Sequence, residues 1–309
     1  MEINSSATDR PDFLVFGEYA CDLIITGLPE LPQLGADIFG TGMGMMAGGA
    51  FNLVRALHRL GAGVLWSAGF GSDLFSQFVL DEIRQEGVDP RLLRRFDRPV
   101  RRISLAFSYT HERGFISYAD PIDPLDRPAL VLEVRPRCVV LDGLEYGPEL
   151  LNLAAAAHQA GGLIAMDCQS GPETLQTPGL TAALQAVDVF LPNLAEALQL
   201  TGRDAAEEAA AELAQFSPLV VLKQGPQGAL AASQAERICA PAIPARVVDT
   251  TGAGDCFNAG FLFHYLRGED LLTCLRYGNI CGGLSTQSHG TCAAPTSQEA
   301  SAVYRDFYS

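Results

Sequence analysis

The sequence predicts an α/β fold with a mainly parallel central sheet, helices on both faces of that sheet, and a small β lid. Strand-like apolar runs recur along the chain, at residues 13–16, 64–67, 138–141, 163–166, 187–191 and 219–222. Segments of helical length separate these runs, and strands that alternate with helices form a parallel sheet covered on both faces. The 309 residues, 48% of them hydrophobic, can bury a large core.

The segments between the strands have the spacing of amphipathic helices. Apolar and polar residues recur with a period near 3.6 in residues 50–60, 74–86, 148–160, 194–200 and 205–215. Two regions, residues 19–46 and 101–118, instead contain alternating, β-branched and aromatic residues around turn signals. We expect these two regions to form the lid, inserted in a single domain that covers residues 10–309.

Charge and composition exclude several classes of partner. The net charge is −15, which repels nucleic acid and acidic membrane surfaces. No apolar run reaches the roughly 18 residues of a membrane span, and the first ten residues lack the pattern of a signal peptide. The eight cysteines show no Cys-x-x-Cys spacing, as expected for thiols in a reducing compartment. We therefore expect a cytoplasmic protein that binds a small molecule.

The segment of residues 247–255 carries the chemistry. Gly252, Ala253 and Gly254 precede Asp255, and an apolar helix pattern follows. Glycines at a helix start let backbone N–H groups face an anion, and the helix dipole adds to the attraction. Asp255 could accept the proton of an attacking hydroxyl while these amides take up the charge of a transferred phosphoryl group. A capped helix with an acidic first turn would use the same residues.

This segment and several others resemble the ribokinase-like family of carbohydrate kinases, also called the phosphofructokinase-B family. Residues 249–255 match the family's carboxyl-terminal signature, and residues 48–52 match its amino-terminal signature. Residues 69–73, 87–89 and 193–196 add further matches in the right order. The resemblance implies the ribokinase-like three-layer fold and transfer of the ATP γ-phosphoryl to a hydroxyl of a sugar or related small polyol. Asp255 would be the catalytic base.

The resemblance also implies which residues hold the two substrates. The residues that orient the acceptor would be Asp22, Gly48, Gly49 and Asn52. The residues near the nucleotide would be Asn193, Gly225, Gly228 and Asn279. An Asn-x-x-Glu at a helix start is also a common cap, and a Gly-x-x-Gly after a strand is also a common turn. Lys223, the single lysine, either points to the nucleotide phosphates or extends past the end of the sheet.

Two cations and a homodimer follow from the same resemblance. Glu196 would hold Mg²⁺ beside the ATP phosphates through water. A monovalent cation such as potassium would lie in a loop closed by a later segment, among Asp249, Thr251, Ser285, Ser288 and Gly290. Its ligands would be mainly backbone carbonyls, which residue identity constrains poorly. The lid would form a homodimer, since an open antiparallel sheet needs cover.

The sequence departs from the family's pattern at one place that bears on the acceptor. Members often have Asp-x-Asn-x-Arg where this chain has residues 167–171, Asp-Cys-Gln-Ser-Gly, without the arginine. An arginine there would suit a phosphorylated acceptor, so its absence favours a neutral polyol. Arg113 and His111 in the lid could supply a positive group instead, or could lie in a solvated turn.

Other interpretations compete with this one. A dinucleotide-binding dehydrogenase is the main rival, because residues 42–47 fit a loose Gly-x-Gly-x-x-Ala fingerprint, but they do not end the first strand. A Walker-type NTPase lacks its Gly-Lys-Ser/Thr, since Gln224 follows Lys223. A nucleoside kinase of the same family stays open. So does a catalytically silent sugar or nucleoside sensor, although Asp255 and its glycines are intact.

Overall fold

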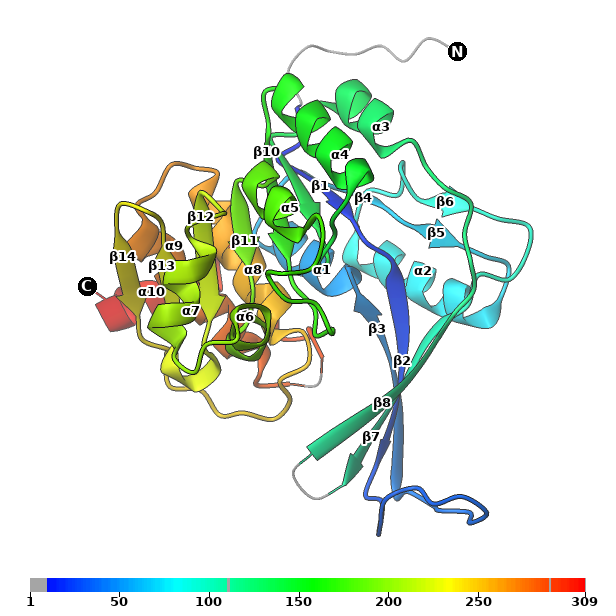
Figure 1. Cartoon of the computed structure of the whole chain (residues 1–309). Coiled ribbons are helices and arrows are strands. Elements are labelled where there is room, and N and C mark those ends of the chain that lie inside the picture. Colours follow the sequence, from blue (N-terminus) through cyan, green and yellow to red (C-terminus); the bar gives the residue numbers. More distant parts are fainter. Residues whose placement is uncertain (1–9, 110–111, 289, 309) are drawn as a thin grey trace.

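The computed structural model describes residues 10–109, 112–288 and 290–308 and has three layers, with helices on both faces of a central sheet (Figure 1). In this part of the chain the central sheet has eight strands in the order β14-β13-β12-β11-β10-β9-β1-β4. Neighbours from β4 to β12 pair in parallel, and β13 and β14 add an antiparallel edge. The strands are β1 (Phe13–Phe16), β4 (Val64–Ser67), β9 (Cys138–Leu141), β10 (Leu163–Asp167), β11 (Val189–Leu191), β12 (Leu219–Lys223), β13 (Ala229–Ala232) and β14 (Arg237–Ala240).

The two faces of this sheet bury two separate apolar clusters. Successive residues of a strand point to opposite faces, so Phe13 and Val15 of β1 belong to one cluster and Leu14 and Phe16 to the other. The first face is covered by α1 (Phe51–Arg59), α2 (Leu74–Glu86), α8 (Ala253–Tyr265), α9 (Leu271–Ser285) and α10 (Ser297–Tyr308). The second is covered by α3 (Arg127–Val134), α4 (Pro148–Gln159), α5 (Leu180–Ala186), α6 (Leu194–Thr201) and α7 (Ala206–Leu213).

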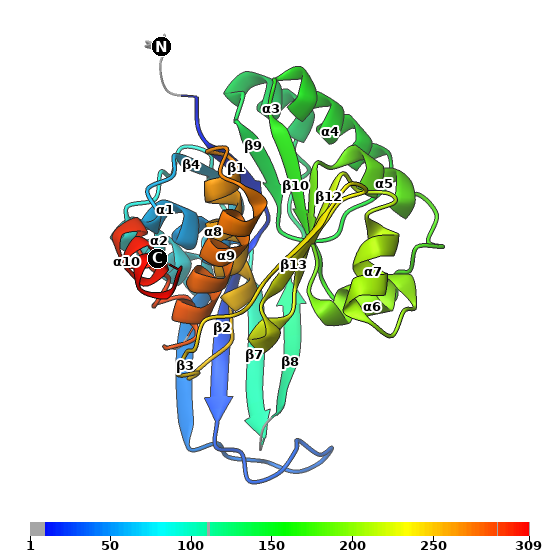
Figure 2. The same cartoon turned by 90° about the vertical axis from the view of Figure 1, so that its left-hand side faces the viewer.

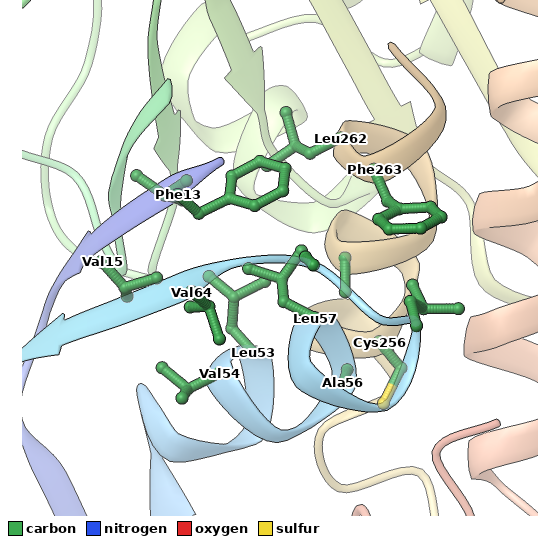
Figure 3. Close-up of a cluster of buried hydrophobic side chains, with 14 of the residues drawn as sticks. Phe13, Val15, Leu53, Val54, Ala56, Leu57, Val64, Cys256, Leu262 and Phe263 are labelled. Carbon is green, nitrogen blue, oxygen red and sulfur yellow. The ribbon is translucent and has the colours of Figure 1, made fainter. Parts of the chain in front are cut away.

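Packing against α1 and β1 holds α8, the helix that carries Asp255 in its first turn. Figure 3 shows Phe13 of β1 beside Leu262 and Phe263 of α8, with Leu57 of α1 close to them. These side chains are almost fully buried. Because interiors are packed as densely as organic crystals, such a contact leaves α8 little freedom to shift relative to the sheet.

The lid is a four-stranded sheet that projects from the body (Figure 2). Its order is β3-β2-β7-β8, with β2 and β7 parallel and the other pairs antiparallel. The strands are β2 (Tyr19–Thr26), β3 (Gly42–Gly49), β7 (Arg102–Tyr109) and β8 (Glu112–Ala119). Since β2 starts shortly after β1 and β3 ends just before α1, the base of the lid lies at the carboxyl end of the central strands.

The predicted three-layer α/β fold is confirmed, and the strands and helices that were predicted differ from the observed ones only by a few residues at their ends. The runs at residues 13–16, 64–67 and 138–141 coincide with β1, β4 and β9, and residues 74–86 coincide with α2. The hairpin of β13 and β14, the helices α3 and α5, and the short pair β5 (Gly69–Phe70) and β6 (Arg94–Arg95) were not predicted. Residues 42–47, the dehydrogenase-like fingerprint, lie in a lid strand.

Across the described ranges, none of the helices is long and apolar enough to cross a membrane.

Candidate active site

The candidate site lies at the carboxyl edge of the parallel strands, where open α/β sheets bind their ligands. Asp167 ends β10, Lys223 ends β12, and Asp142 directly follows β9. The helix α8 begins at Ala253 on the same side and carries Asp255 in its first turn. Residues far apart in the sequence therefore meet at this edge.

Gly252 makes the turn that opens α8. Its φ is +74°, a left-handed conformation that favours glycine. A Cβ on Gly252 would lie 2.3 Å from Thr291 Cγ2, so the backbone also approaches too closely for a side chain. Among the proposed anion-binding amides, that of Ala253 already donates to the Thr250 carbonyl at 3.2 Å. Within the described ranges, the N–H groups of Gly254 and Asp255 find no acceptor, which leaves them available to an anion.

The Asp255 carboxylate lies in a setting suited to a base. Burial and, next, the charge of Asp167 raise the pKa of Asp255 to about 7, while Lys223 and a hydrogen bond from Asn52 act in the opposite direction. A base whose pKa lies near the working pH is both ionised and able to hold a proton. The structure thus places the predicted Asn52 close enough to Asp255 to lower its pKa.

Asp22 and the glycine pair Gly48 and Gly49 form the side of the site next to Asp255, the acceptor wall. A Cβ on Gly48 would lie 2.3 Å from Asp22 Oδ2, so the carboxylate rests directly on the glycine backbone. Gly49 has a φ of +65°, and a Cβ there would lie 2.5 Å from the Glu18 carbonyl. Burial, with a smaller contribution from the charge of Asp249, raises the pKa of Asp22 to about 6. Only glycines fit this corner of the lid.

Lys223 is held by two side chains below the anion site. Its Nζ donates to Asp167 Oδ1 at 2.7 Å and to Asn258 Oδ1 at 3.2 Å, and Asn258 Nδ2 donates to Asp167 Oδ2 at 2.7 Å. A methyl group on Gly254 would lie 3.7 Å from the ammonium. Lys223 therefore does not merely extend past the sheet end: it joins β10, β12 and α8 beneath the amides.

Asp142 is a site residue that the sequence analysis missed. Burial, followed by the charges of Asp255 and Asp167, raises its pKa well above the usual value. A Cβ on Gly17 would lie 2.5 Å from Asp142 Cβ, so the aspartate packs directly against the end of β1. Its position just after an apolar strand was the signal that could have found it.

A cavity of about 560 Å³ opens beside the start of α8, a size typical of small-molecule sites. Its lining includes four predicted nucleotide residues, Lys223, Gly225, Gly228 and Asn279, together with Gly254 of the predicted anion site. The Asn279 amide donates to the carbonyls of Ala240 and Pro241 at 3.0 and 3.1 Å, which ties α9 to the end of β14. Gly282 and Gly283 also line it and pack closely, with Cβ positions 3.0 Å from Ala253 O and 2.8 Å from Ile243.

Asn193 and Glu196 form a capping box at the start of α6. Asn193 Oδ1 accepts from the Glu196 N–H at 3.0 Å, and Glu196 Oε2 accepts from the Asn193 N–H at 2.7 Å. Burial raises the pKa of Glu196, which faces a separate recess of about 250 Å³ beside residues 168–171. The cap is thus present, and the second Glu196 oxygen faces no hydrogen-bond donor within the described ranges.

The loop expected around a monovalent cation is closed by Asp249. This buried carboxylate accepts from the Thr251 N–H at 2.8 Å and from the Gly290 N–H at 3.1 Å. The Ser285 hydroxyl donates to the Gly282 carbonyl at 2.8 Å. The buried Ser288 Oγ has no hydrogen-bond partner among the residues that the structure describes. The two predicted segments therefore meet.

His111 lies outside the described residues, and the Arg113 side chain is not described.

The sequence matches the pfkB family carbohydrate kinase profile over residues 15–298. The chain belongs to the pfkB family. This membership confirms the expected carbohydrate kinase, a phosphotransferase that uses ATP. The ribokinase of Bacillus subtilis is 25% identical over 283 residues, which cover 89% of this chain and 93% of that protein.

Solved structures show that this pfkB protein shares its fold with ribokinases and nucleoside kinases. The ribokinase of Arabidopsis thaliana, complexed with ribose and ATP, superposes with a TM-score of 0.82 at 23% identity and covers 96% of this chain and 99% of its own. The Burkholderia thailandensis nucleoside kinase, in complex with inosine, superposes with a TM-score of 0.73 at 21% identity and covers 96% and 98% of the two chains.

Replacing Asp167 by Asn should lower the pKa of Asp255. Asp167 is the neighbouring charge that raises this pKa most, and its neutralisation also releases Lys223 to favour the ionised base. A lower pKa keeps the base ionised further into acid, so the acidic limb of kcat/KM against pH should move down by roughly one unit or more. Asp81→Asn, on the exposed side of α2, is the control. An acidic limb that stays in place or moves to higher pH would contradict this electrostatic account.

Proposed function

We propose that this pfkB kinase transfers the ATP γ-phosphoryl to a hydroxyl of a neutral sugar or nucleoside, with Asp255 as the base. The observation that carries the proposal is the placement of the Asp255 carboxylate beside two N–H groups, of Gly254 and Asp255 itself, that find no acceptor within the described ranges. A base and an anion site at one helix start are the parts that phosphoryl transfer to an alcohol needs.

In this mechanism each side chain acts on one substrate. Asp22, Gly49 and Asn52 hold the acceptor so that one of its hydroxyls faces Asp255, and Asp142 closes the same wall. Asp255 accepts the hydroxyl proton as the oxygen attacks the γ-phosphorus. The N–H groups of Gly254 and Asp255 receive the charge that spreads over the transferred phosphoryl oxygens.

The nucleotide is proposed to occupy the cavity of about 560 Å³ beside α8. Gly225 and Gly228, with φ of +55° and +96°, line it after β12, and Asn279 lines it from α9. Lys223 would bring positive charge to the phosphates from beneath Gly254. Asn193, at the start of α6, would approach the phosphates from the next strand end.

Glu196 fits a magnesium ion held through water. One of its carboxylate oxygens caps α6, while the other faces no donor among the described residues, and burial raises its pKa. Mg²⁺ usually keeps several waters and is bound by one or two carboxylates together with substrate phosphates. Because the recess beside Glu196 is separate from the nucleotide cavity, the phosphates would have to extend from that cavity toward the start of α6, where the ion would neutralise their charge.

The Asp249 loop fits a monovalent cation such as potassium. Asp249 joins the Thr251 and Gly290 backbones, and the buried Ser288 hydroxyl finds no partner in the described part of the chain. Ser285 would contribute its carbonyl, since its hydroxyl is engaged. A bound cation would order the loop that leads into Gly252.

The charges around the acceptor wall favour a neutral acceptor. Asp22, Asp142 and Asp255 are carboxylates with raised pKa values, and the nearby Lys223 is already paired with Asp167. A phosphorylated acceptor would bring further negative charge to this wall. Like charges placed together disfavour the wrong ligand.

The acceptor is tested by ADP release with ATP, Mg²⁺ and a panel of sugars and nucleosides. For a matched pair, such as ribose and ribose 5-phosphate or fructose and fructose 6-phosphate, kcat/KM should favour the neutral compound by roughly tenfold or more. A preference for the phosphate ester would sink the neutral-acceptor proposal and direct attention to a lid arginine. ADP release with none of the panel would favour the sensor hypothesis instead.

Turnover should require Mg²⁺ and should be faster in potassium than in sodium or tetramethylammonium. The expected reason is that a fitting cation orders the loop between Asp249 and Gly252 beside the anion site. The three salts are compared at equal ionic strength, so that screening of charges is the same in each. Equal rates in all three salts would rule out the cation site.

We also propose that two lids pair in a homodimer. Exposed apolar side chains lie on both edge strands of the lid, Met43 and Met45 on β3 and Phe115, Ile116 and Tyr118 on β8. Unpaired edges and exposed apolar surface both favour association. Sedimentation equilibrium should give twice the chain mass, and a monomer at micromolar concentration would contradict the proposal.

Residues 10–309 are proposed to act as one kinase domain in the cytoplasm. All eight cysteines are free, and six of them are buried, which suits a reducing compartment. Recovery of the protein in a membrane or secreted fraction of the native cells would contradict this location.

A further inference from the structure

Three buried polar side chains connect α1 and the C-terminal segment to the proposed base. Arg55, Thr291 and Asn52 are 2%, 0% and 6% exposed. Arg55 Nη1 donates to Thr291 Oγ1 at 3.2 Å, and the Thr291 hydroxyl donates to Asn52 Oδ1 at 2.9 Å. The other end of the Asn52 amide, Nδ2, lies beside the start of α8, 3.3 Å from the Cβ position of Gly252, and Asn52 lowers the pKa of Asp255. Neither Arg55 nor Thr291 has a role in the mechanism described above.

The chemistry of these groups fixes the direction of the hydrogen bonds that run from Arg55 through Thr291 to Asn52. A guanidinium has only donors, so the oxygen of Thr291 accepts from Arg55 and the hydroxyl proton must point elsewhere. That proton goes to Asn52, which must therefore present its acceptor, Oδ1, to Thr291. The Asn52 NH₂ group is then the part left to face the Asp255 carboxylate, which can only accept when ionised.

Arg55 itself cannot easily turn away. Its Nη2 lies 2.9 Å from Glu82 Oε2 and its Nε lies 3.3 Å from Glu86 Oε1, both on α2. The guanidinium also lies over the Phe51 ring, 4.5 Å from its centroid. With two sides held by carboxylates and one face covered, the remaining Nη1 is aimed at Thr291.

We propose that Arg55 and Thr291 are positioning residues that fix the Asn52 amide with its NH₂ group toward Asp255. Without the Thr291 hydroxyl, the amide loses the partner that distinguishes its oxygen from its nitrogen and can turn over. An Asn52 oxygen facing the ionised base would repel it and would present the wrong group to the acceptor. The inference rests on the proposed function, because it concerns the orientation of an acceptor-binding residue beside the base.

The two branches of Thr291 allow the hydroxyl to be tested apart from packing. The Cγ2 methyl packs on the Gly252 backbone, where a Cβ would approach it to 2.3 Å, while Oγ1 joins Arg55 to Asn52. Thr291→Val keeps the methyl and removes the hydroxyl. Thr291→Ser keeps the hydroxyl and removes the methyl. Thr291→Ala removes both and adds no bulk, so it serves if the valine variant does not fold.

The experiment measures kcat and KM for the acceptor and for ATP in all four proteins, with circular dichroism to confirm folding. The valine and alanine variants should lose about tenfold or more in kcat/KM for the acceptor, the scale of a hydrogen bond to a charged group. The serine variant should stay within about threefold of the unchanged protein, and KM for ATP should change little in any variant. Arg55→Met alone should lower kcat/KM for the acceptor. Added to Thr291→Val, it should cause no further loss, because Arg55 and Thr291 act through the same Asn52 amide.

Each other outcome decides against the inference. Loss in serine and alanine but not in valine would assign the effect to the methyl contact with Gly252. Equal losses for ATP and acceptor would indicate a general loosening of the C-terminal segment. Additive losses for Arg55→Met and Thr291→Val would separate the two residues. An unchanged protein without turnover on any acceptor would instead overturn the proposed function, and this inference with it.

Discussion

Several carboxylates lie close together at the carboxyl edge of the sheet, and the rest of the site depends on how their negative charge is compensated. The charge of Asp167 acts on Asp255, and the charges of Asp255 and Asp167 act on Asp142. Burial raises the pKa of Asp255 and of Asp142, and the neighbouring negative charges raise both further. The positive charge of Lys223 compensates this negative charge through an ion pair with Asp167, and Asn258 also accepts from its ammonium. The result is a base that ionises near neutral pH without being fixed in a salt bridge of its own.

The fold supplies this edge by bringing together elements that are distant in sequence. Parallel strands bring Asp142, Asp167 and Lys223 to one edge of the sheet, and the first turn of α8 brings Asp255 close to them. The packing of α8 on α1 and β1 sets its height and angle (Figure 3). The lid leaves β1 and returns to α1 at Gly49, so the acceptor wall is anchored on both sides of the site. The contacts that hold α8 and the lid in place are therefore also the contacts that position the side chains of the site.

Much of this arrangement could be predicted from local sequence, and the rest depends on tertiary contacts. β1 was predictable because four consecutive apolar residues are buried on both faces of a parallel sheet. β13 was missed because its four residues, Ala-Leu-Ala-Ala, lack the β-branched and aromatic types that favour strands. The Asp255 motif could be predicted because a glycine directly before a helix indicates a left-handed backbone conformation, as found at Gly252.

Other features of the site could not be predicted from local sequence alone. Thr291 lies 239 residues from its partner Asn52, and nothing in its surroundings in the sequence indicates a hydrogen-bonding role. The Ala253 amide belongs to the predicted anion site, yet the turn geometry uses it for the Thr250 carbonyl. Asp142 follows a strand, which is a local signal, but the charges of Asp255 and Asp167 that act on it are brought close only in the folded sheet.

The most direct test of the account is the replacement of Asp255 by Asn, which nearly preserves size while removing the base. If Asp255 accepts the acceptor's proton during transfer, turnover should fall by roughly 10²-fold or more, the usual scale for general-base catalysis. Calorimetric binding of an ATP analogue to the folded variant should change far less, since the amides of the anion site remain. Near-normal turnover in a folded Asp255→Asn protein would remove Asp255 from the mechanism and contradict the account.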